Sequence, residues 1–213
     1  MGQSTRNVVV FDLGGVLARI CHTWEEAADV AGVPHDLSPA GPTALGGFSG
    51  FDLYQAGKIS FPVYLKELAL FIGCSDEDSP KVHNSIIVEE YPGIRELVRD
   101  LRAAGFSLGC LSNTNDAHWG HLALNGRFPV IESLDMKMAS HIVGLNKPDP
   151  FIYRAYAAEF GLHPEQIVFF DDHPANVQAA VSEGWLAAHI VPGEDTARQM
   201  RRYLREWGLL PGR

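Results

Sequence analysis

Asp12 is the first residue whose type and position indicate chemistry. It follows the apolar run VVVF at residues 8–11 and precedes a turn with two glycines, Gly14 and Gly15. A short β-branched run predicts a buried central strand, and a carboxylate at its carboxyl end lies where open α/β sheets bind ligands. An ionised carboxylate needs no base to activate it, so Asp12 is the candidate nucleophile.

Three later segments carry complementary residue types: LSNTN at 111–115, NKPDP at 146–150 and FFDDHPAN at 169–176. Two of the three follow apolar runs that predict strands. Because the carboxyl ends of parallel strands meet at one edge of a sheet, the segments predict a shared site. That site would hold a nucleophile, hydroxyl and amide donors, an ammonium and a pair of carboxylates. These are the functional groups that phosphoryl transfer through an aspartyl-phosphate requires.

Each segment has a candidate role. Ser112 and Asn113 follow a predicted strand, so the hydroxyl and backbone amides can bind phosphoryl oxygens as substrate-binding groups. Lys147, followed by Pro148 and Pro150, can neutralise the phosphoryl group and Asp12, which makes it both a catalytic and a substrate-binding candidate. Asp171 and Asp172 repel each other unless a cation holds them, and Mg²⁺ prefers carboxylate oxygens.

This ordered set of motifs resembles the haloacid dehalogenase-like hydrolase superfamily over nearly the whole chain. It is closest to the sugar-phosphate (glucose-1-phosphate-type) phosphatase branch, whose first motif reads Asp-Leu-Gly. The resemblance implies Mg²⁺ as cofactor, with Asp12, the Gly14 carbonyl and Asp172 as ligands. It implies that Asp171 lies next to these ligands and contacts the metal ion through them or through a bridging water.

Gly14 departs from the usual pattern. Most phosphatases that this chain resembles carry a second aspartate here, which protonates the leaving group and then activates water. Glycine can do neither, although its carbonyl can still bind Mg²⁺. Loss of a general acid costs on the order of 10²–10⁴-fold in rate for a poor leaving group. A glycine required only by the turn explains the residue equally well.

The resemblance favours a Mg²⁺-dependent phosphomonoesterase acting on a small phosphorylated metabolite, with sugar 1-phosphates as candidate substrates. Carbon–halogen or carbon–phosphorus hydrolysis is the enzymatic alternative, because those branches also lack the second aspartate. Dehalogenation needs no metal, so Asp171 and Asp172 argue against it. Carbon–phosphorus cleavage needs a cap lysine with a lowered pKa, and neither Lys58 nor Lys66 lies in an apolar run. A weakly active, phosphate-binding regulatory protein is a third reading, supported only by Gly14.

The spacing of the predicted elements indicates an insertion. A strand over 7–11 is followed by the next clear strand only at 106–111, far more than one crossover needs. We therefore expect a small helical cap over 18–90 and an α/β core formed by 1–17 and 91–213. Alternating strands and helices in the core predict a doubly wound, Rossmann-like parallel sheet. The run at 130–133 predicts one further short strand.

Composition limits the remaining possibilities. The 213 residues are 46% hydrophobic and 20% charged, with a net charge of −9. An acidic chain without a basic run argues against nucleic-acid and membrane partners. The chain shows no secretory leader or membrane-length apolar stretch, so a cytoplasmic location is expected. His118 and His121 form no metal-binding motif and are expected to be ordinary surface or loop residues, and the oligomeric state is left open.

Overall fold

A parallel five-stranded sheet organises the larger part of the molecule in a computed structural model, which describes residues 6–37, 43–123 and 126–211. The strand order is β5-β4-β1-β6-β7. The bounds are Val8–Phe11 for β1, Ser107–Ser112 for β4, Met136–Ala139 for β5, Ile167–Asp171 for β6 and Leu186–His189 for β7. Strand β1 is central and pairs in parallel with both β4 and β6.

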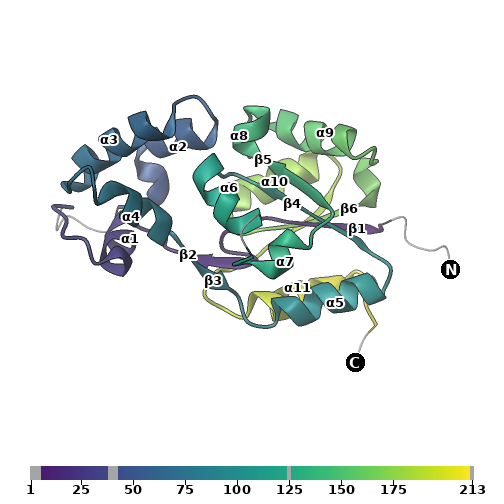
Figure 1. Ribbon diagram of the computed structural model, residues 1–213. Coiled ribbons are helices and arrows are strands. Elements are labelled where there is room, and N and C mark those ends of the chain that lie inside the picture. The colour runs from purple at the N-terminus through teal and green to yellow at the C-terminus, as the bar shows by residue number, and fades with distance from the viewer. Residues whose placement is uncertain (1–5, 38–42, 124–125, 212–213) are drawn as a thin grey trace.

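Helices cover both faces of this sheet (Figure 1). Successive side chains of β1 point to opposite faces, so Val9 and Phe11 pack in one core and Val8 and Val10 in another. The first core lies against α5 (Ile94–Ala103) and α11 (Thr196–Glu206), and the second against α9 (Pro150–Glu159) and α10 (Pro174–Ser182). The predicted doubly wound α/β fold is confirmed.

The predicted strand at 130–133 is wrong. Pro129 begins the short helix α7 (Pro129–Glu132), and the strand of this region is β5, a few residues later. Proline fits the first turn of a helix because its missing N–H has no partner there in any case. Two further helices, α6 (Asp116–Ala123) and α8 (Ser140–Val143), follow β4 and β5 at the carboxyl edge of the sheet.

A second apolar cluster lies in the segment predicted as a cap. It is built by α1 (Trp24–Ala31), α2 (Ser49–Gln55), α3 (Phe61–Ile72) and α4 (Ser79–Ser85), with a 3₁₀ turn at Leu45–Gly47. Trp24 is fully buried at its centre, where Phe48 and Phe51 meet it edge-on and its indole N–H donates to the Leu45 carbonyl. The four helices therefore share a core of their own.

Two short antiparallel strands join this helical segment to the sheet: β2 (Ala18–Ile20) and β3 (Ile87–Glu90). Ala18 and Ile87 pack in the core of the sheet. Cys21, three residues after Ala18, and Ile86, just before Ile87, pack in the helical cluster. The packing thus changes close to the predicted boundaries at 18 and 90, and the division into two domains stays a prediction. No helix within the described ranges is both long and apolar enough to cross a membrane.

Candidate active site

The carboxyl ends of the three central strands carry the predicted polar residues to one place. Phe11 of β1 is aligned with Cys110 of β4 and with Phe170 of β6. Asp12 therefore emerges one residue before the level of Ser112, the last residue of β4, and level with Asp171, the last residue of β6. The Asp12 backbone N–H donates to the Phe170 carbonyl at 2.8 Å, which extends the ladder to the nucleophile candidate itself.

Lys147 is the cation of this cluster. Its Nζ lies 3.0 Å from Asp12 Oδ1 and 2.6 Å from Asp171 Oδ2, and its side chain has no exposed surface. Burial lowers the pKa of Lys147, but the attraction of the two carboxylates outweighs it, and the net pKa is raised. The ammonium is therefore charged and fixed between the first and last motifs.

Asn113 holds the backbone of Lys147 in place. Its side-chain oxygen accepts from the Lys147 N–H at 2.8 Å, and its side-chain nitrogen donates to the Lys147 carbonyl at 2.9 Å. The sequence suggested that this segment binds phosphoryl oxygens. The Asn113 side chain positions the lysine, and Ser112 is buried at the end of β4; phosphoryl binding by the Ser112 hydroxyl and the backbone amides stays a prediction.

Asp171 and Asp172 have different surroundings. Asp171 is fully buried and accepts from Lys147 Nζ, from the Asn176 side chain at 2.9 and 3.1 Å, and from the His173 backbone N–H at 2.8 Å. Its oxygens are thus committed to positioning neighbouring groups. Asp172 is partly exposed and lies against the turn after β1.

Gly15 makes that approach possible. Its φ of 72° lies in the left-handed region, and a Cβ on this residue would meet Asp172 Oδ2 at 2.2 Å. A side chain would collide with the carboxylate, so only glycine permits this contact. The Gly-Gly pair was visible in the sequence, but the carboxylate that needs it is far along the chain.

The three carboxylates form one acidic group. Oxygen atoms of Asp12, Asp171 and Asp172 lie within 4.8 Å of one another. Burial, with the neighbouring carboxylates adding to it, raises the pKa of Asp12 to about 7 against the opposing effect of Lys147. Burial and Asp171 raise the pKa of Asp172 to about 6. Three carboxylates beside one ammonium leave a negative excess that a divalent cation would neutralise.

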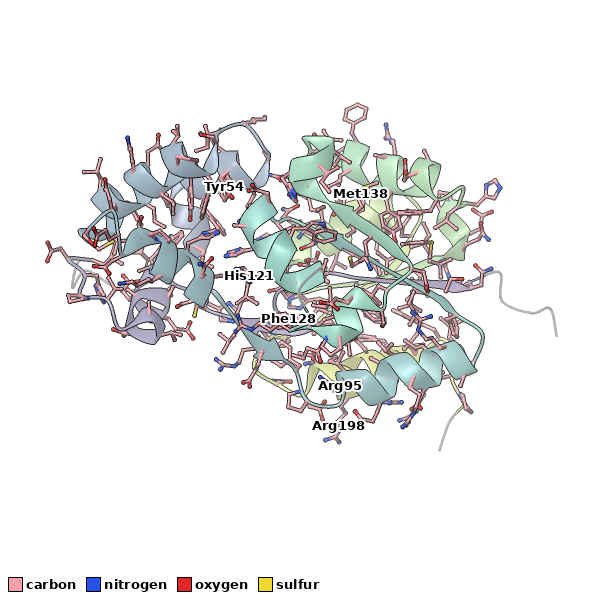
Figure 2. All side chains as sticks on the ribbon, viewed as in Figure 1. Tyr54, Arg95, His121, Phe128, Met138 and Arg198 are labelled. Carbon is pink, nitrogen blue, oxygen red and sulfur yellow. The ribbon has the colours of Figure 1, made fainter. Side chains whose placement is uncertain are left out.

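The segment after β4 continues into a junction with the helical segment 21–86. Ser140 Oγ accepts from the Thr114 N–H at 2.9 Å and lies 2.6 Å from the Gln55 carbonyl of that helical segment. The Tyr54 hydroxyl donates to Asp116, and Figure 2 shows Tyr54 where α2 faces α6. Hydrogen bonds therefore connect the helical segment to the start of α6 and, through Ser140, to the loop that follows Ser112.

The prediction that His118 is an ordinary surface or loop residue is wrong. It is buried, and its ring stacks on that of His83 with centroids 3.9 Å apart and planes 4° from parallel. His118 Nε2 lies 2.8 Å from the His83 carbonyl, and its Nδ1 lies 3.3 Å from the Asn115 side chain. His83 Nδ1 in turn pairs with the Tyr64 hydroxyl at 3.0 Å. Helices α4 and α6 thus meet through two buried imidazoles.

Comparisons with known proteins identify the family. A sequence model of the haloacid dehalogenase-like hydrolases matches residues 7–184. Phosphatase MT3486 of Mycobacterium tuberculosis (strain CDC 1551 / Oshkosh) is 27% identical over 87% of this chain and 87% of its own length. Acyl-CoA dehydrogenase family member 10 of Mus musculus is 26% identical over 95% of this chain, which spans only 19% of that longer protein.

A solved structure has the same fold. It is the HAD family enzyme bt-2542 of Bacteroides thetaiotaomicron, a wild-type protein in complex with magnesium and inorganic phosphate. It superposes with a TM-score of 0.72 over 92% of this chain and 100% of that chain, at 24% identity. The family model spans most of the chain and includes every candidate site residue. The chain therefore belongs to the haloacid dehalogenase-like hydrolases.

Proposed function

We propose that this hydrolase is a Mg²⁺-dependent phosphomonoesterase that acts through an aspartyl-phosphate on Asp12. The observation that carries the proposal is the contact of Asp12 with Lys147 at 3.0 Å inside a group of three carboxylates. A carboxylate nucleophile beside a fixed ammonium fits attack on a phosphoryl group, whose developing charge needs compensation. The names of MT3486, a phosphatase, and of the magnesium and phosphate complex of bt-2542 agree with this reading.

The residues present fit a magnesium ion. All three carboxylates supply hard oxygen donors. When they are ionised, the three carboxylates and the Lys147 ammonium together carry a net charge of −2. Asp12, the Gly14 carbonyl and Asp172 would hold the ion, with Asp171 kept nearby by Lys147 and Asn176. When bound, Mg²⁺ supplies charge stabilisation for the phosphoryl oxygens and the attacking carboxylate.

Each side chain of the site then has a separate role in the reaction. Asp12 attacks phosphorus, while Lys147 offsets charge on the phosphoryl oxygens and Ser112 donates its hydroxyl to one of them. Asn113 acts on Lys147 by fixing its backbone. Water then hydrolyses the aspartyl-phosphate and restores the Asp12 carboxylate.

Gly14 bears on the substrate. With no carboxylate at this position, leaving groups that depart without help are favoured, such as the anomeric oxygen of a sugar 1-phosphate or an aryl oxygen. A small phosphorylated metabolite of this kind is the proposed substrate. The assignment to the sugar-phosphate branch and the cytoplasmic location stay predictions.

The alternatives are less well supported. Carbon–phosphorus cleavage needs a lysine that forms a Schiff base from the helical segment, yet Lys58 and Lys66 are both exposed. Carbon–halogen hydrolysis gives no reason for Asp172 to lie beside Asp12 and Asp171. Apart from Gly14, no observed feature favours a merely phosphate-binding protein.

A substrate screen tests the proposal. Sugar 1-phosphates, sugar 6-phosphates, nucleotides and aryl phosphates are incubated with the wild type in Mg²⁺ and in excess chelator, and released phosphate is measured. We expect turnover in Mg²⁺ only, and none from Asp172→Ala. Phosphate release that chelator leaves unchanged would refute the Mg²⁺ requirement, and no phosphate release from any ester would refute the phosphatase.

A further inference from the structure

The space that a side chain at position 14 would enter is already filled. A Cβ built on Gly14 would lie 2.9 Å from Ile20 Cδ1 and 3.4 Å from Ile20 Cγ2. Gly14 is not among the glycines with a positive φ, so its backbone would accept a side chain. The obstacle is therefore the isoleucine and not the backbone.

Local structure fixes Ile20 over Gly14. The pairing of β2 with β3 shifts register between Arg19 and Ile20, and such irregularities turn a side chain from its regular direction. The turn beneath is held by a hydrogen bond of 2.9 Å from the Gly15 N–H to the Ala18 carbonyl and by a bridge between Gly14 and Ala18. Ile20 is half-buried and packs against the apolar cluster of the helices, and this packing favours its position over Gly14.

We propose that Ile20 is a specificity-determining residue that keeps the leaving-group side of the site apolar and free of any proton donor. The proposal rests on the proposed phosphatase function and extends it to the substrate. The favoured substrates are phosphate esters of acidic hydroxyls, in particular aryl and anomeric phosphates. An aliphatic wall also favours an apolar face on the leaving group.

The bond changes explain this preference. As an oxygen of Asp12 forms its bond to phosphorus, the ester P–O bond breaks and its electron pair stays on the leaving oxygen. Methyl groups of Ile20 cannot protonate that oxygen, which takes its proton from water after departure. The rate then depends steeply on the acidity of the departing hydroxyl.

Paired substitutions test the role of Ile20. We would measure kcat/KM in Mg²⁺ for a series of aryl phosphates of graded phenol pKa and for an alkyl phosphate. The proteins are the wild type, Gly14→Asp, Ile20→Ala and the double variant. Arg19→Ala is the matched control, since Arg19 lies in the same strand as Ile20 and its side chain pairs with Glu89 of β3 at 3.1 Å.

The double variant should respond most strongly. In Gly14→Asp/Ile20→Ala the new carboxylate has room, so the ratio of alkyl to aryl turnover should rise by about 10-fold or more over wild type. Gly14→Asp alone must displace Ile20 and should gain far less, whereas Ile20→Ala alone and Arg19→Ala should keep the steep wild-type dependence.

Other outcomes separate the two proposals. Equal gains from Gly14→Asp with and without Ile20→Ala would overturn the role of Ile20, as would a folded, Mg²⁺-binding double variant with the wild-type dependence. If the double variant does not fold, Gly14→Asp/Ile20→Val takes its place, because it removes only the closest methyl group. Failure of the wild type to hydrolyse any aryl or sugar phosphate would refute the phosphatase and the Ile20 proposal together.

Discussion

At the scale of single residues, the site combines groups that favour function at the expense of stability. Asp12, Asp171 and Asp172 are crowded together, and among the described residues Lys147 is the cation paired with two of them. The raised pKa of Asp12 means that its ionised form disfavours the folded state. The protonated form of Asp12 favours the folded state. This stabilisation is fully present below the ordinary aspartate pKa and is lost as pH rises through about 7.

Asp12→Asn should abolish turnover without harming the fold. The amide cannot act as nucleophile, so we expect kcat to fall by about 10³-fold or more. Its neutral side chain relieves carboxylate repulsion, so thermal unfolding without metal should occur at the same temperature as in wild type or higher. Asp149→Asn is the matched control, because that exposed carboxylate only caps α9 and asparagine caps equally well. Activity of Asp12→Asn above a few per cent of wild type would exclude Asp12 as nucleophile.

Gly15→Ala tests the approach of Asp172 to the turn. Alanine would adopt an unfavourable positive φ and would also collide with Asp172 Oδ2. The first effect costs roughly 1 kcal/mol. Gly161→Ala has the same φ problem, with no atom within 4 Å of its Cβ, so it isolates that cost. We expect both variants to lose stability in urea, but only Gly15→Ala to lose Mg²⁺ affinity and activity; equal behaviour of the two would contradict the assigned contact.

At the scale of elements, the strands that carry the site could be predicted from sequence. Continuous apolar runs precede Asp12, Asp171 and the Ser112 segment, and such runs have few structural alternatives when long enough. The run at 130–133 was too short to exclude a helix, and Pro129 begins the helix α7 there. Strand β5, with the sequence MKMA, lies at the sheet edge and carries no β-branched residue to reveal it.

Side-chain partners were beyond sequence reasoning. His83 and His118 lie 35 residues apart, and nothing in either segment indicates that their rings stack. The same is true of Ile20 above Gly14, which lies beside a register shift between two short strands. The order of the motifs revealed which groups converge, but not which of them position the others, as Asn113 does for Lys147.

The junction between α4 and α6 predicts a pH-dependent stability. Burial lowers the pKa of His118 to about 4 and that of His83 well below its usual range. Both rings are thus neutral when folded, whereas the unfolded chain binds protons below pH about 6.5. The contribution of the two neutral rings to the free energy of unfolding is complete above that pH and is lost as pH falls towards 4. For His118 this loss is on the order of 3 kcal/mol.

His118→Phe isolates this contribution. The variant retains an aromatic ring against His83 but cannot bind a proton. We expect a lower free energy of unfolding at pH 7, from lost hydrogen bonds, and a smaller decline between pH 6.5 and 4 than in wild type. Urea unfolding across that range provides the measurement, and parallel pH curves for the two proteins would show that His118 is not buried as a neutral ring.

At the scale of the whole molecule, metal binding should stabilise the fold. An ion that binds only the folded state adds about 2.7 kcal/mol at 100 times its Kd. Mg²⁺ should therefore raise the unfolding temperature of the wild type and of Asp149→Asn, and should have little effect on Asp172→Ala. Calorimetric unfolding with and without Mg²⁺ tests this without measuring activity. A full Mg²⁺ shift in Asp172→Ala would remove that residue as a ligand.

The central position of β1 has a consequence for biosynthesis. This strand precedes both of its neighbours in the chain, and they begin only at residues 107 and 167. On the ribosome, Val8–Phe11 must remain without a sheet partner while four helices with their own apolar core emerge. The helical segment can therefore fold before the sheet, and β1 gains its first partner only with β4 and its second only with β6.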